Sequence, residues 1–388
     1  MPSIGVVSAD VLSAAQDVVE VIEAHADDAE RSRRLPADTV AALVAGDLMR
    51  MCVPSTYGGP EVDPVTMLRA ISTLAHADGA AGWCSMIAST TSSMAAFLPA
   101  ESAVEIYGDP SVVTGGVFAP NGKGVASVSD VDGREVEGFR VDGRWSWGSG
   151  TQHCQWILGG ALCDDGTFRL AWFPQADVTF HDTWHTGGMR GSGSLDYSVD
   201  GAFVPSSRTM QPGVSAPVVD SALARFPNFA LLAASVASVG LGVARRALDE
   251  LGDLAQGKTP QYSSRTLAHN SFTQIEFARA EGVLRSATAF LLDEVGSAWD
   301  EVEASGSVSL ERRTSIRLAA THAATSSTTA ADTAYTLAGG AAVYDTSLLG
   351  RCLRDAHVVT QHIQTAPKLN QKIGSLMLGV DGVDVAMF

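Results

Sequence analysis

The chain has 388 residues, of which 46% are hydrophobic and 18% are charged. A chain of this length can bury a sizeable core and is expected to form two or three packing units. Its formal net charge of −17 argues against nucleic acid and anionic membranes as partners, because both bind basic patches.

Cysteine usage and the start of the chain predict a cytoplasmic protein. The five cysteines are scattered without a Cys-x-x-Cys pair, which is typical of reduced thiols. No metal-ligand spacing of Cys or His occurs, so no metal is expected. Asp10 and Asp17 come before any apolar run that could act as a signal peptide. Residues 229–244 are too short and too rich in small residues to span a bilayer, so a buried helix is expected there.

The first third of the chain is predicted to be helical. Apolar residues recur at three- and four-residue spacing, and Asp63-Pro64 resembles an N-cap followed by proline at the first helical position. Glycine and proline predict a loop over residues 54–60. The predicted helices are 9–31, 38–48, 64–77, 79–97 and 100–107. Residues 1–111 are therefore expected to form an N-terminal helical domain.

Residues 112–216 show short strand-like runs between turn signals. The predicted strands are 125–131, 135–141, 156–162, 168–173 and 197–204. Asp132-Gly133, Asp142-Gly143 and Asp165-Gly166 are pairs typical of hairpin turns. This pattern predicts a central antiparallel β domain.

Residues 217–388 return to long helical patterns, which predict a C-terminal four-helix bundle. The expected helices are 220–255, 264–303, 309–338, 345–365 and 367–379. The order of helices, then strands, then a helical bundle is unusual enough to be informative.

Motifs along nearly the whole chain resemble signatures of the acyl-CoA dehydrogenase superfamily. The N-terminal signature is Leu35-Pro36 with Val53-Pro54 and Tyr57-Gly58-Gly59. The sheet-domain signature is residues 188–194 with Phe203-Val204-Pro205. The C-terminal signature is residues 337–340 with Arg354-Asp355-Ala356, and the three occur in the family's order. Each motif is weak alone. Together they imply the acyl-CoA dehydrogenase fold, which is a mixed α and β fold.

The residues after Arg354-Asp355-Ala356 differ from those of the dehydrogenases. A Tyr-Glu-Gly-Thr run follows there in the dehydrogenases, and its glutamate removes the substrate α-proton. His362 takes the tyrosine position here, and Ile363, which cannot accept a proton, takes the glutamate position. A histidine has a pKa suited to proton transfer near neutral pH. The pattern resembles the two-component flavin-dependent monooxygenases of the superfamily.

The run from Asp142 to Trp156 carries the clearest resemblance to a flavin site. By similarity, Trp147 packs beside the flavin ring and the Ser149 hydroxyl meets flavin N5. Aromatic hydroxylases of this branch carry Ser-Gly followed by His-x-x-Trp, which matches His153 and Trp156. The alternative is that Trp147 and Trp156 are core aromatics of a sheet.

Further cofactor contacts are implied by the resemblance. Backbone amides of a loop at Phe118 and Ala119 would hold the pyrimidine edge of the flavin. Arg265 and Gln274, on a C-terminal helix, would contact the pyrophosphate and adenine of a neighbouring subunit's flavin, although Arg265 could equally be a solvated arginine. The pair Gly339-Gly340 could approach a phosphate or allow a tight helix crossing.

Two histidines compete for the catalytic role, and the resemblance favours His362. His357 stands five residues earlier on the same predicted helix and so points elsewhere, towards a subunit contact or an N-terminal helix. Many relatives carry a second histidine after a Gly-Trp pair, but residues 89–93 here are serines and threonines. The substrate pocket is predicted at Trp83, Thr90, Thr91 and Ile363.

No Gly-x-Gly-x-x-Gly opens a strand–helix unit, so no nicotinamide site is expected. The resemblance implies reduced FAD, with FMN as an alternative, supplied by a separate NAD(P)H flavin reductase and used with O2 through a flavin C4a-hydroperoxide. Few charges stand near the proposed site residues, so an apolar aromatic substrate of the indole or phenol type is the first one expected. The chain also resembles indole hydroxylases of bacterial indolosesquiterpenoid (xiamycin-type) pathways.

The sequence is also compatible with several other functions. They are N-oxidation by a nitrososynthase-type monooxygenase, sulfur oxidation, an acyl-CoA dehydrogenase with another base, and a flavin carrier without catalysis. Apolar residues on more than one face of the late helices predict a homo-oligomer, with a tetramer favoured over a dimer.

Overall fold

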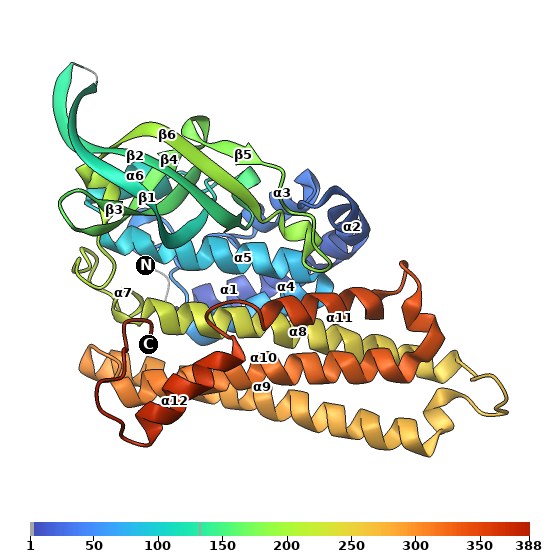
Figure 1. The fold of residues 1–388 in the computed structure, drawn as a ribbon. Coiled ribbons are helices and arrows are strands. Elements are labelled where there is room, and N and C mark those ends of the chain that lie inside the picture. The colour runs from blue at the N-terminus through green and yellow to red at the C-terminus, as the bar shows by residue number, and fades with distance from the viewer. Residues whose placement is uncertain (1–3, 132) are drawn as a thin grey trace. The chain divides into compact units, whose positions relative to one another are not determined.

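A computed structural model describes residues 4–131 and 133–388. Helices come first, followed by strands from Thr114 to Met210, and then by helices again (Figure 1). Two compact units share these elements. The first is Met1–Asp63, Cys84–Thr186 and Arg190–Arg225, and the second is Pro64–Trp83, Gly187–Met189 and Phe226–Phe388. The three domains expected from the sequence (1–111, 112–216, 217–388) stay a prediction.

The helices before the sheet agree with the predicted ones in type and differ at their ends. The predicted helix 9–31 is divided at Val18, and the predicted helix 79–97 continues as a 3-10 turn over Ser93–Phe97. Pro64 opens its helix as expected. These helices are α1 (Ile4–Asp17), α2 (Val19–Ser32), α3 (Ala37–Ala45), α4 (Pro64–Ala77), α5 (Gly79–Ser92) and α6 (Ala100–Tyr107).

The first unit contains a seven-stranded sheet in the order β5-β6-β2-β1-β3-β4-β7. All neighbouring strands are antiparallel except β1 and β3, which are parallel. The five predicted strands are present, whereas the short β5 and β7 were not predicted. The strands are β1 (Thr114–Val131), β2 (Arg134–Gly148), β3 (Trp156–Cys163), β4 (Phe168–Pro174), β5 (Thr179–His181), β6 (Leu195–Pro205) and β7 (Thr209–Met210).

The prediction of a hairpin turn at Asp142-Gly143 is wrong. Asp142 lies inside β2 and pairs with Lys123 of β1, and the register with β6 shifts between Val141 and Gly143. A Cβ on Gly143 would lie 2.5 Å from the Trp145 side chain, so this glycine permits a close approach within the sheet. Asp165-Gly166 does form a turn, with Gly166 at φ +81°. Asp132 lies outside the described residues.

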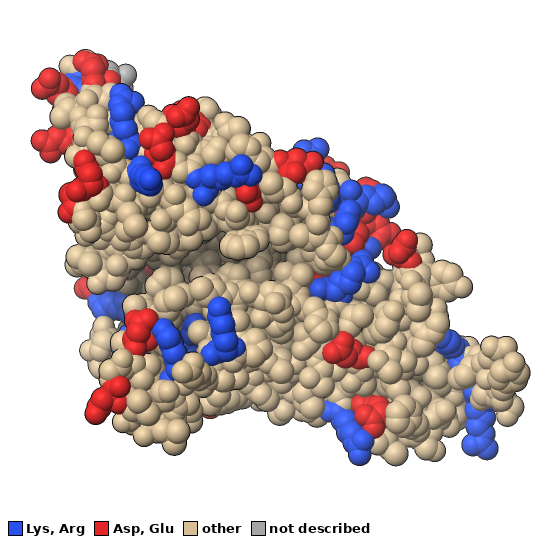
Figure 2. Space-filling model, viewed as in Figure 1, with Lys and Arg blue, Asp and Glu red and all other residues tan. Residues whose placement is uncertain are grey.

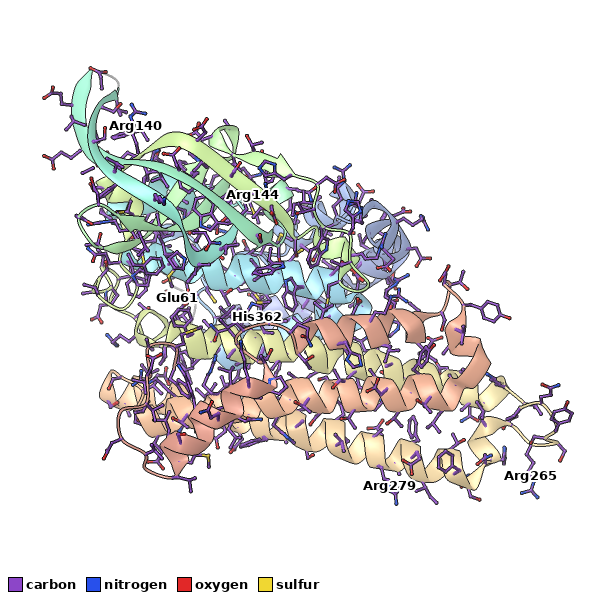
Figure 3. All side chains as sticks on the ribbon, viewed as in Figure 1. Glu61, Arg140, Arg144, Arg265, Arg279 and His362 are labelled. Atoms are coloured by element: carbon purple, nitrogen blue, oxygen red, sulfur yellow. The ribbon has the colours of Figure 1, made fainter. Side chains whose placement is uncertain are left out.

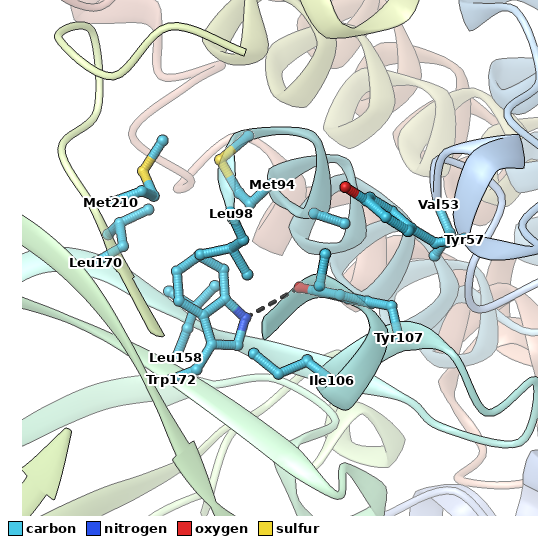
Figure 4. Packing of buried hydrophobic residues seen from close by; sticks show 12 residues of the cluster. Val53, Tyr57, Met94, Leu98, Ile106, Tyr107, Leu158, Leu170, Trp172 and Met210 are labelled. Carbon is cyan, nitrogen blue, oxygen red and sulfur yellow. Dashed lines mark hydrogen bonds between the residues drawn. The ribbon is translucent and has the colours of Figure 1, made fainter. Parts of the chain in front are cut away.

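The core of the first unit joins the helical segment to the sheet (Figure 4). Trp172 of β4 is fully buried, and its indole N–H donates to the hydroxyl oxygen of Tyr107 on α6 at 3.0 Å. The neighbouring Tyr57-Gly58-Gly59 loop requires glycine, because a Cβ on Gly59 would lie 2.1 Å from the Val53 carbonyl oxygen. This packing explains why that motif accompanies the fold.

The second unit is built on three long helices that pack side by side (Figure 1). These helices are α8 (Asn228–Gly257), α9 (Ser271–Ser305) and α10 (Leu310–Ala338). The helix α8 is long and apolar enough to cross a membrane, but 78% of its most apolar window is buried inside the protein. It is therefore the buried helix expected from the sequence.

Several predicted C-terminal helices have different ends in the structure. The predicted helix 220–255 is interrupted at Pro227 into α7 (Ala222–Arg225) and α8, because proline removes a backbone donor. The predicted start at 264 is wrong, because the Asn270 side chain caps α9 by accepting from Phe272 and Thr273. The predicted helix 345–365 is shorter, and α11 is Leu348–Val359. The last helix, α12, is Asn370–Met377.

Charged side chains of both signs are interspersed on the face shown in Figure 2. Acidic residues exceed basic ones by 43 to 26 in the whole chain. An acidic surface of this kind favours solubility and gives no attraction to phosphate backbones.

Candidate functional site

The end of β2 places a short chain of hydroxyl groups in the first unit. Ser149 is buried, and its Oγ lies 2.7 Å from the Oγ of Ser194. The Oγ of Ser194 also lies 2.7 Å from that of Ser192. A hydroxyl can donate one bond while accepting others, so the Ser149 hydroxyl can face a ligand while Ser194 orients it.

Trp147 is a surface aromatic and not a core residue. Its side chain is 72% exposed, although Trp145, two residues earlier, is fully buried. Trp147 also has a φ of +66°, which is uncommon for a residue other than glycine. The alternative that Trp147 is part of the sheet core is therefore wrong. Trp156 is half-buried, with the Arg208 guanidinium 5.0 Å from its ring centre.

The Ser149-Gly150 turn is held tightly by its neighbours. Gly150 has a φ of +67°, and its N–H donates to the Ser192 carbonyl oxygen at 2.8 Å. A Cβ at this position would lie 3.0 Å from the His153 ring, so the serine has to be followed by glycine. Burial lowers the pKa of His153 to about 4, so this histidine is neutral at pH 7.

Phe118 and Ala119 lie within β1 and not in a loop as predicted. The pairing of β1 with β3 shifts between Val117 and Gly122, so these residues form an irregular stretch of the strand. The Ala119 carbonyl oxygen accepts from the Trp145 indole N–H at 3.2 Å. That their amides hold a flavin stays a prediction.

His362 lies in the turn after α11, three residues beyond its last residue, Val359. The prediction that it stands on the helix is wrong. The Thr365 hydroxyl donates to the Val359 carbonyl oxygen at 2.6 Å and turns the chain there. The backbone N–H of Gln364 donates to Nδ1 of His362 at 3.3 Å. A neutral His362 that accepts at Nδ1 carries its proton on Nε2.

The pKa of His362 is lower than the sequence suggested. Burial, together with the positive charge of Arg317, lowers it to about 4. The prediction of a pKa near neutrality is therefore wrong, because that value applies to a solvated imidazole. At pH 7 this side chain is a neutral hydrogen-bond donor.

The predicted substrate residues fall in both units. In the second unit the Trp83 and His362 rings meet edge to face, 5.7 Å apart, and Ile363 is 53% exposed. In the first unit Thr90 and Thr91 are buried on α5, and the Thr90 hydroxyl donates to the Met86 carbonyl oxygen at 2.8 Å. That all of these residues line one pocket stays a prediction.

His357 has a different environment from His362. It is an exposed residue of α11, and its Nε2 lies 3.1 Å from an Asp332 carboxylate oxygen on α10. The expectation that it points away from His362 agrees with this contact. The predicted contact of His357 with a partner subunit or an N-terminal helix stays a prediction.

The Arg354-Asp355-Ala356 motif has a structural role. Asp355 is buried, and its Oδ1 accepts from the Met189 N–H at 2.5 Å. A Cβ on Gly188 would lie 2.5 Å from the Arg354 carbonyl oxygen. The motif therefore holds the Gly188-Met189 segment, which explains why the two sequence signatures occur together.

Sequence reasoning missed Arg317 and Gln364. Arg317 on α10 is fully buried, and its Nη1 donates to the Gln364 side-chain oxygen. Gln364 is also the residue whose N–H meets His362. The available signal was a single arginine within an Ala- and Thr-rich helical stretch. An arginine at a buried position of such a helix is expected to have a partner, because arginine is rarely fully buried without one.

Among the remaining predicted cofactor residues, Arg265 lies at the opposite end of the long helices from His362 (Figure 3). Arg265 is exposed in the loop between α8 and α9, so its predicted position on a helix is wrong. Gln274, near the start of α9, donates to the Ala268 carbonyl oxygen at 2.8 Å. Their flavin contacts stay a prediction.

Gly339 and Gly340 end α10 at the same end of the bundle, where the Lys258 ammonium donates to the Ala338 carbonyl oxygen. Gly339 has φ 57° and ψ −142°, a conformation essentially restricted to glycine. A Cβ on either glycine would meet nothing within 4 Å, so the alternative of a tight helix crossing is wrong within this chain.

The five cysteines are free and buried. Across residues 4–131 and 133–388, no group of three or more His, Cys, Asp or Glu side chains could hold a metal ion.

Comparison with protein families gives two matches. The acyl-CoA dehydrogenase N-terminal domain matches residues 11–100, and the acyl-CoA dehydrogenase C-terminal domain matches residues 234–367. The fold is that of the acyl-CoA dehydrogenases, with N-terminal helices, a mostly antiparallel central sheet and a C-terminal helical domain.

Curated relatives cover most of this chain. Indole-3-acetate monooxygenase of Pseudomonas putida is 33% identical, covering 90% of this chain and 89% of the relative. The flavin-dependent monooxygenase oxygenase subunit HsaA of Rhodococcus jostii is 27% identical, covering 90% and 93%. The FADH2-dependent resorcinol hydroxylase oxygenase component of a Rhizobium species is 24% identical, covering 94% and 93%.

Solved structures show the same fold. The 3-HSA hydroxylase from Rhodococcus sp. RHA1 superposes with a TM-score of 0.87 at 25% identity, covering 98% and 99% of the two chains. XiaF from a Streptomyces species, solved with FADH2 and glycerol, superposes with a TM-score of 0.89 at 24% identity, covering 98% of each chain, and shows the fold alone. The chain belongs to the flavin-dependent monooxygenases with this fold, as the oxygenase component of a two-component system.

Proposed function

We propose that this chain uses reduced flavin and O2 to hydroxylate a ring carbon of a small aromatic substrate of the indole or phenol type. One observation carries the proposal. The turn after α11 presents a neutral His362 and an exposed Ile363, where a dehydrogenase needs an ionised carboxylate. Neither side chain can serve as a strong base at pH 7. Acyl-CoA dehydrogenation therefore has no base at this position.

His362 is suited to donating a hydrogen bond. Its Nδ1 accepts from Gln364, so Nε2–H is directed to another partner. The Trp83 ring packs edge to face with the imidazole, with ring centres 5.7 Å apart, and so restricts rotation of the imidazole. We assign to Nε2–H the task of donating a hydrogen bond to an oxygen of the substrate, such as a hydroxyl oxygen, which orients the carbon to be oxidised.

The first unit has features that fit a flavin. Trp147 offers an exposed aromatic face, and the Ser149 hydroxyl is oriented by Ser194. Ser149 would hold the proton at flavin N5, and Trp147 would lie against the ring system. When bound, reduced FAD, or FMN as the alternative, supplies two electrons and activates the oxygen. A separate NAD(P)H-dependent reductase would deliver it.

Assembly into a homo-oligomer, a tetramer in preference to a dimer, is part of the proposal. Large apolar side chains are exposed at the bundle end that carries Arg265, namely Tyr262, Phe272, Ile275, Val343 and Tyr344. Exposing these side chains to water is unfavourable for a single chain, whereas contact with a second copy would bury them. Arg265 and Gln274 could then reach a flavin held by the neighbouring subunit.

Coupled turnover tests the proposal. The purified protein is supplied with FAD, a flavin reductase and NADH, and then with indole, indole-3-acetate or a phenol, while oxygen uptake, peroxide and product are measured. We expect tighter binding of reduced than of oxidised FAD, and hydroxylated product. His362→Ala should lower product formation by at least about a hundredfold while flavin oxidation continues and releases peroxide.

His357→Ala is the matched control, because it removes an exposed histidine of α11. It should leave coupling close to that of the unmodified protein. Bleaching of bound oxidised flavin by an acyl-CoA would contradict the proposal. So would full coupled turnover in His362→Ala together with loss of product in His357→Ala.

A further inference from the structure

Arg317 is a buried cation that the proposed chemistry does not yet use. It lies on α10 with 0% of its surface exposed. Its Nη1 donates to the Phe229 carbonyl oxygen at 3.3 Å and to the Gln364 side-chain oxygen. Its Nε and Nη2 are buried and have no hydrogen-bond partner in the described part of the chain.

An unpaired buried charge is costly, and Arg317 is charged. Burial lowers its pKa to about 10, which still leaves the guanidinium protonated at neutral pH. Removing a charged group from water is unfavourable unless an opposite charge compensates. Within residues 4–131 and 133–388, no carboxylate forms an ion pair with Arg317. A compensating anion would have to come from elsewhere.

The two free donors have the geometry that suits a carboxylate. Nε and Nη2 lie on the same edge of the guanidinium, and two parallel N–H groups match the two oxygens of a carboxylate. The Phe388 ring, 5.6 Å from the guanidinium carbon, covers the flat face and leaves this edge to another partner.

Arg317 is also connected to His362. Gln364 accepts from Arg317 through its side chain and donates to His362 Nδ1 through its backbone. The charge on Arg317 helps to lower the pKa of His362, so the two groups are close enough to interact electrostatically. A substrate held by His362 could therefore place an acidic side arm against Arg317.

We propose that Arg317 binds the carboxylate of the substrate through Nε and Nη2, so that the enzyme selects aromatic carboxylic acids over neutral analogues. This inference rests on the proposed function and names the substrate class of the same site. The overall charge of −17 gives an anion no long-range attraction, so a local cation is needed. The relative that is 33% identical is named for such an acid, indole-3-acetate.

The free edge is closed in this structure, so binding requires a neighbouring side chain to move or an internal water to leave. The competing interpretation is that Arg317 is structural and that water alone satisfies its free edge. The two interpretations differ in whether Arg317 discriminates between acidic and neutral ligands.

Matched ligands separate these interpretations. Indole-3-acetate and 3-methylindole share a ring and differ in the carboxylate. Their affinities for the protein with reduced flavin are measured by calorimetry under anaerobic conditions, and kcat/KM is measured with reductase and NADH. Arg317→Met should weaken binding of indole-3-acetate by about ten- to hundredfold and change that of 3-methylindole by less than about threefold. The affinity of Arg317→Lys for indole-3-acetate should lie between those of the unmodified protein and Arg317→Met.

Arg313→Met is the matched control, because Arg313 is also on α10 with an unpartnered Nε but donates to the Phe388 backbone oxygen. It should leave the preference unchanged. The inference is overturned if the unmodified protein binds both ligands equally, or if Arg317→Met weakens both equally. If Arg317→Met does not fold, unchanged selectivity in Arg317→Lys overturns it as well. Turnover of 3-methylindole without a preference for the acid would refute this inference alone. Absence of any aromatic turnover would refute the proposed function instead.

Discussion

Lowering the pH should destabilise this protein through two histidines that are neutral when folded. Burial lowers the pKa values of His153 and His362 to about 4 each, whereas an unfolded histidine has a pKa of about 6.5. Between these values the unfolded chain binds more protons than the folded one, so stability rises with pH. The contribution is fully present above pH 6.5 and is lost as the pH falls towards 4.

The expected magnitude follows from the protonation of each state at pH 5. An unfolded histidine is then almost fully protonated, and a folded one with a pKa of about 4 is about one-tenth protonated. Going from pH 7.5 to pH 5 therefore costs about 2 kcal/mol for each histidine as an upper value. The two together should lower the free energy of unfolding by up to about 4 kcal/mol.

Urea unfolding followed by circular dichroism at the two pH values, at one protein concentration, measures this loss. His362→Asn and His153→Asn should each reduce the pH-dependent loss by about 2 kcal/mol. His357→Asn, which replaces an exposed histidine beside Asp332, is measured alongside them as the matched histidine substitution. An unchanged pH dependence in His362→Asn would refute the conclusion that this ring is neutral because of its surroundings.

Four further changes test other parts of the structure. Ser149→Ala should lower the free energy of unfolding by only about 1 kcal/mol but release more peroxide per NADH; equal product yield would show that the hydroxyl does not hold flavin N5. Trp147→Ala should leave the melting temperature within a few degrees, because the ring is 72% exposed, and should weaken binding of reduced flavin in a fluorescence titration. Gly339→Ala should lower the free energy of unfolding, measured with urea, by about 1–3 kcal/mol. Gly340→Ala should lower it by less, because Gly339 has a positive φ and Gly340 does not. Arg265→Ala should leave the free energy of unfolding unchanged and weaken flavin binding by the oligomer. An unchanged flavin affinity would show that Arg265 is only a solvated arginine.

The element types could be predicted from the sequence because they depend on local pattern. The five longer strands and the late helices follow from alternation, helical periodicity and turn residues. The failures have specific causes. Asp142-Gly143 has turn chemistry but serves a close approach to Trp145 inside β2. The prediction that extended α9 back to 264 missed the cap at Asn270.

The family could be recognised from the sequence alone, because it depends on which residue types stand at motif positions. The same positions predict that the dehydrogenase base is lost. Ile363 cannot act as a base in any fold. The behaviour of the remaining residues depends on the folded structure. The neutrality of His362 depends on burial and on Arg317, which is 45 residues away in the sequence and linked to it through Gln364. A pKa is set by the surroundings of a group in space, and those surroundings come from chain segments that only folding brings together.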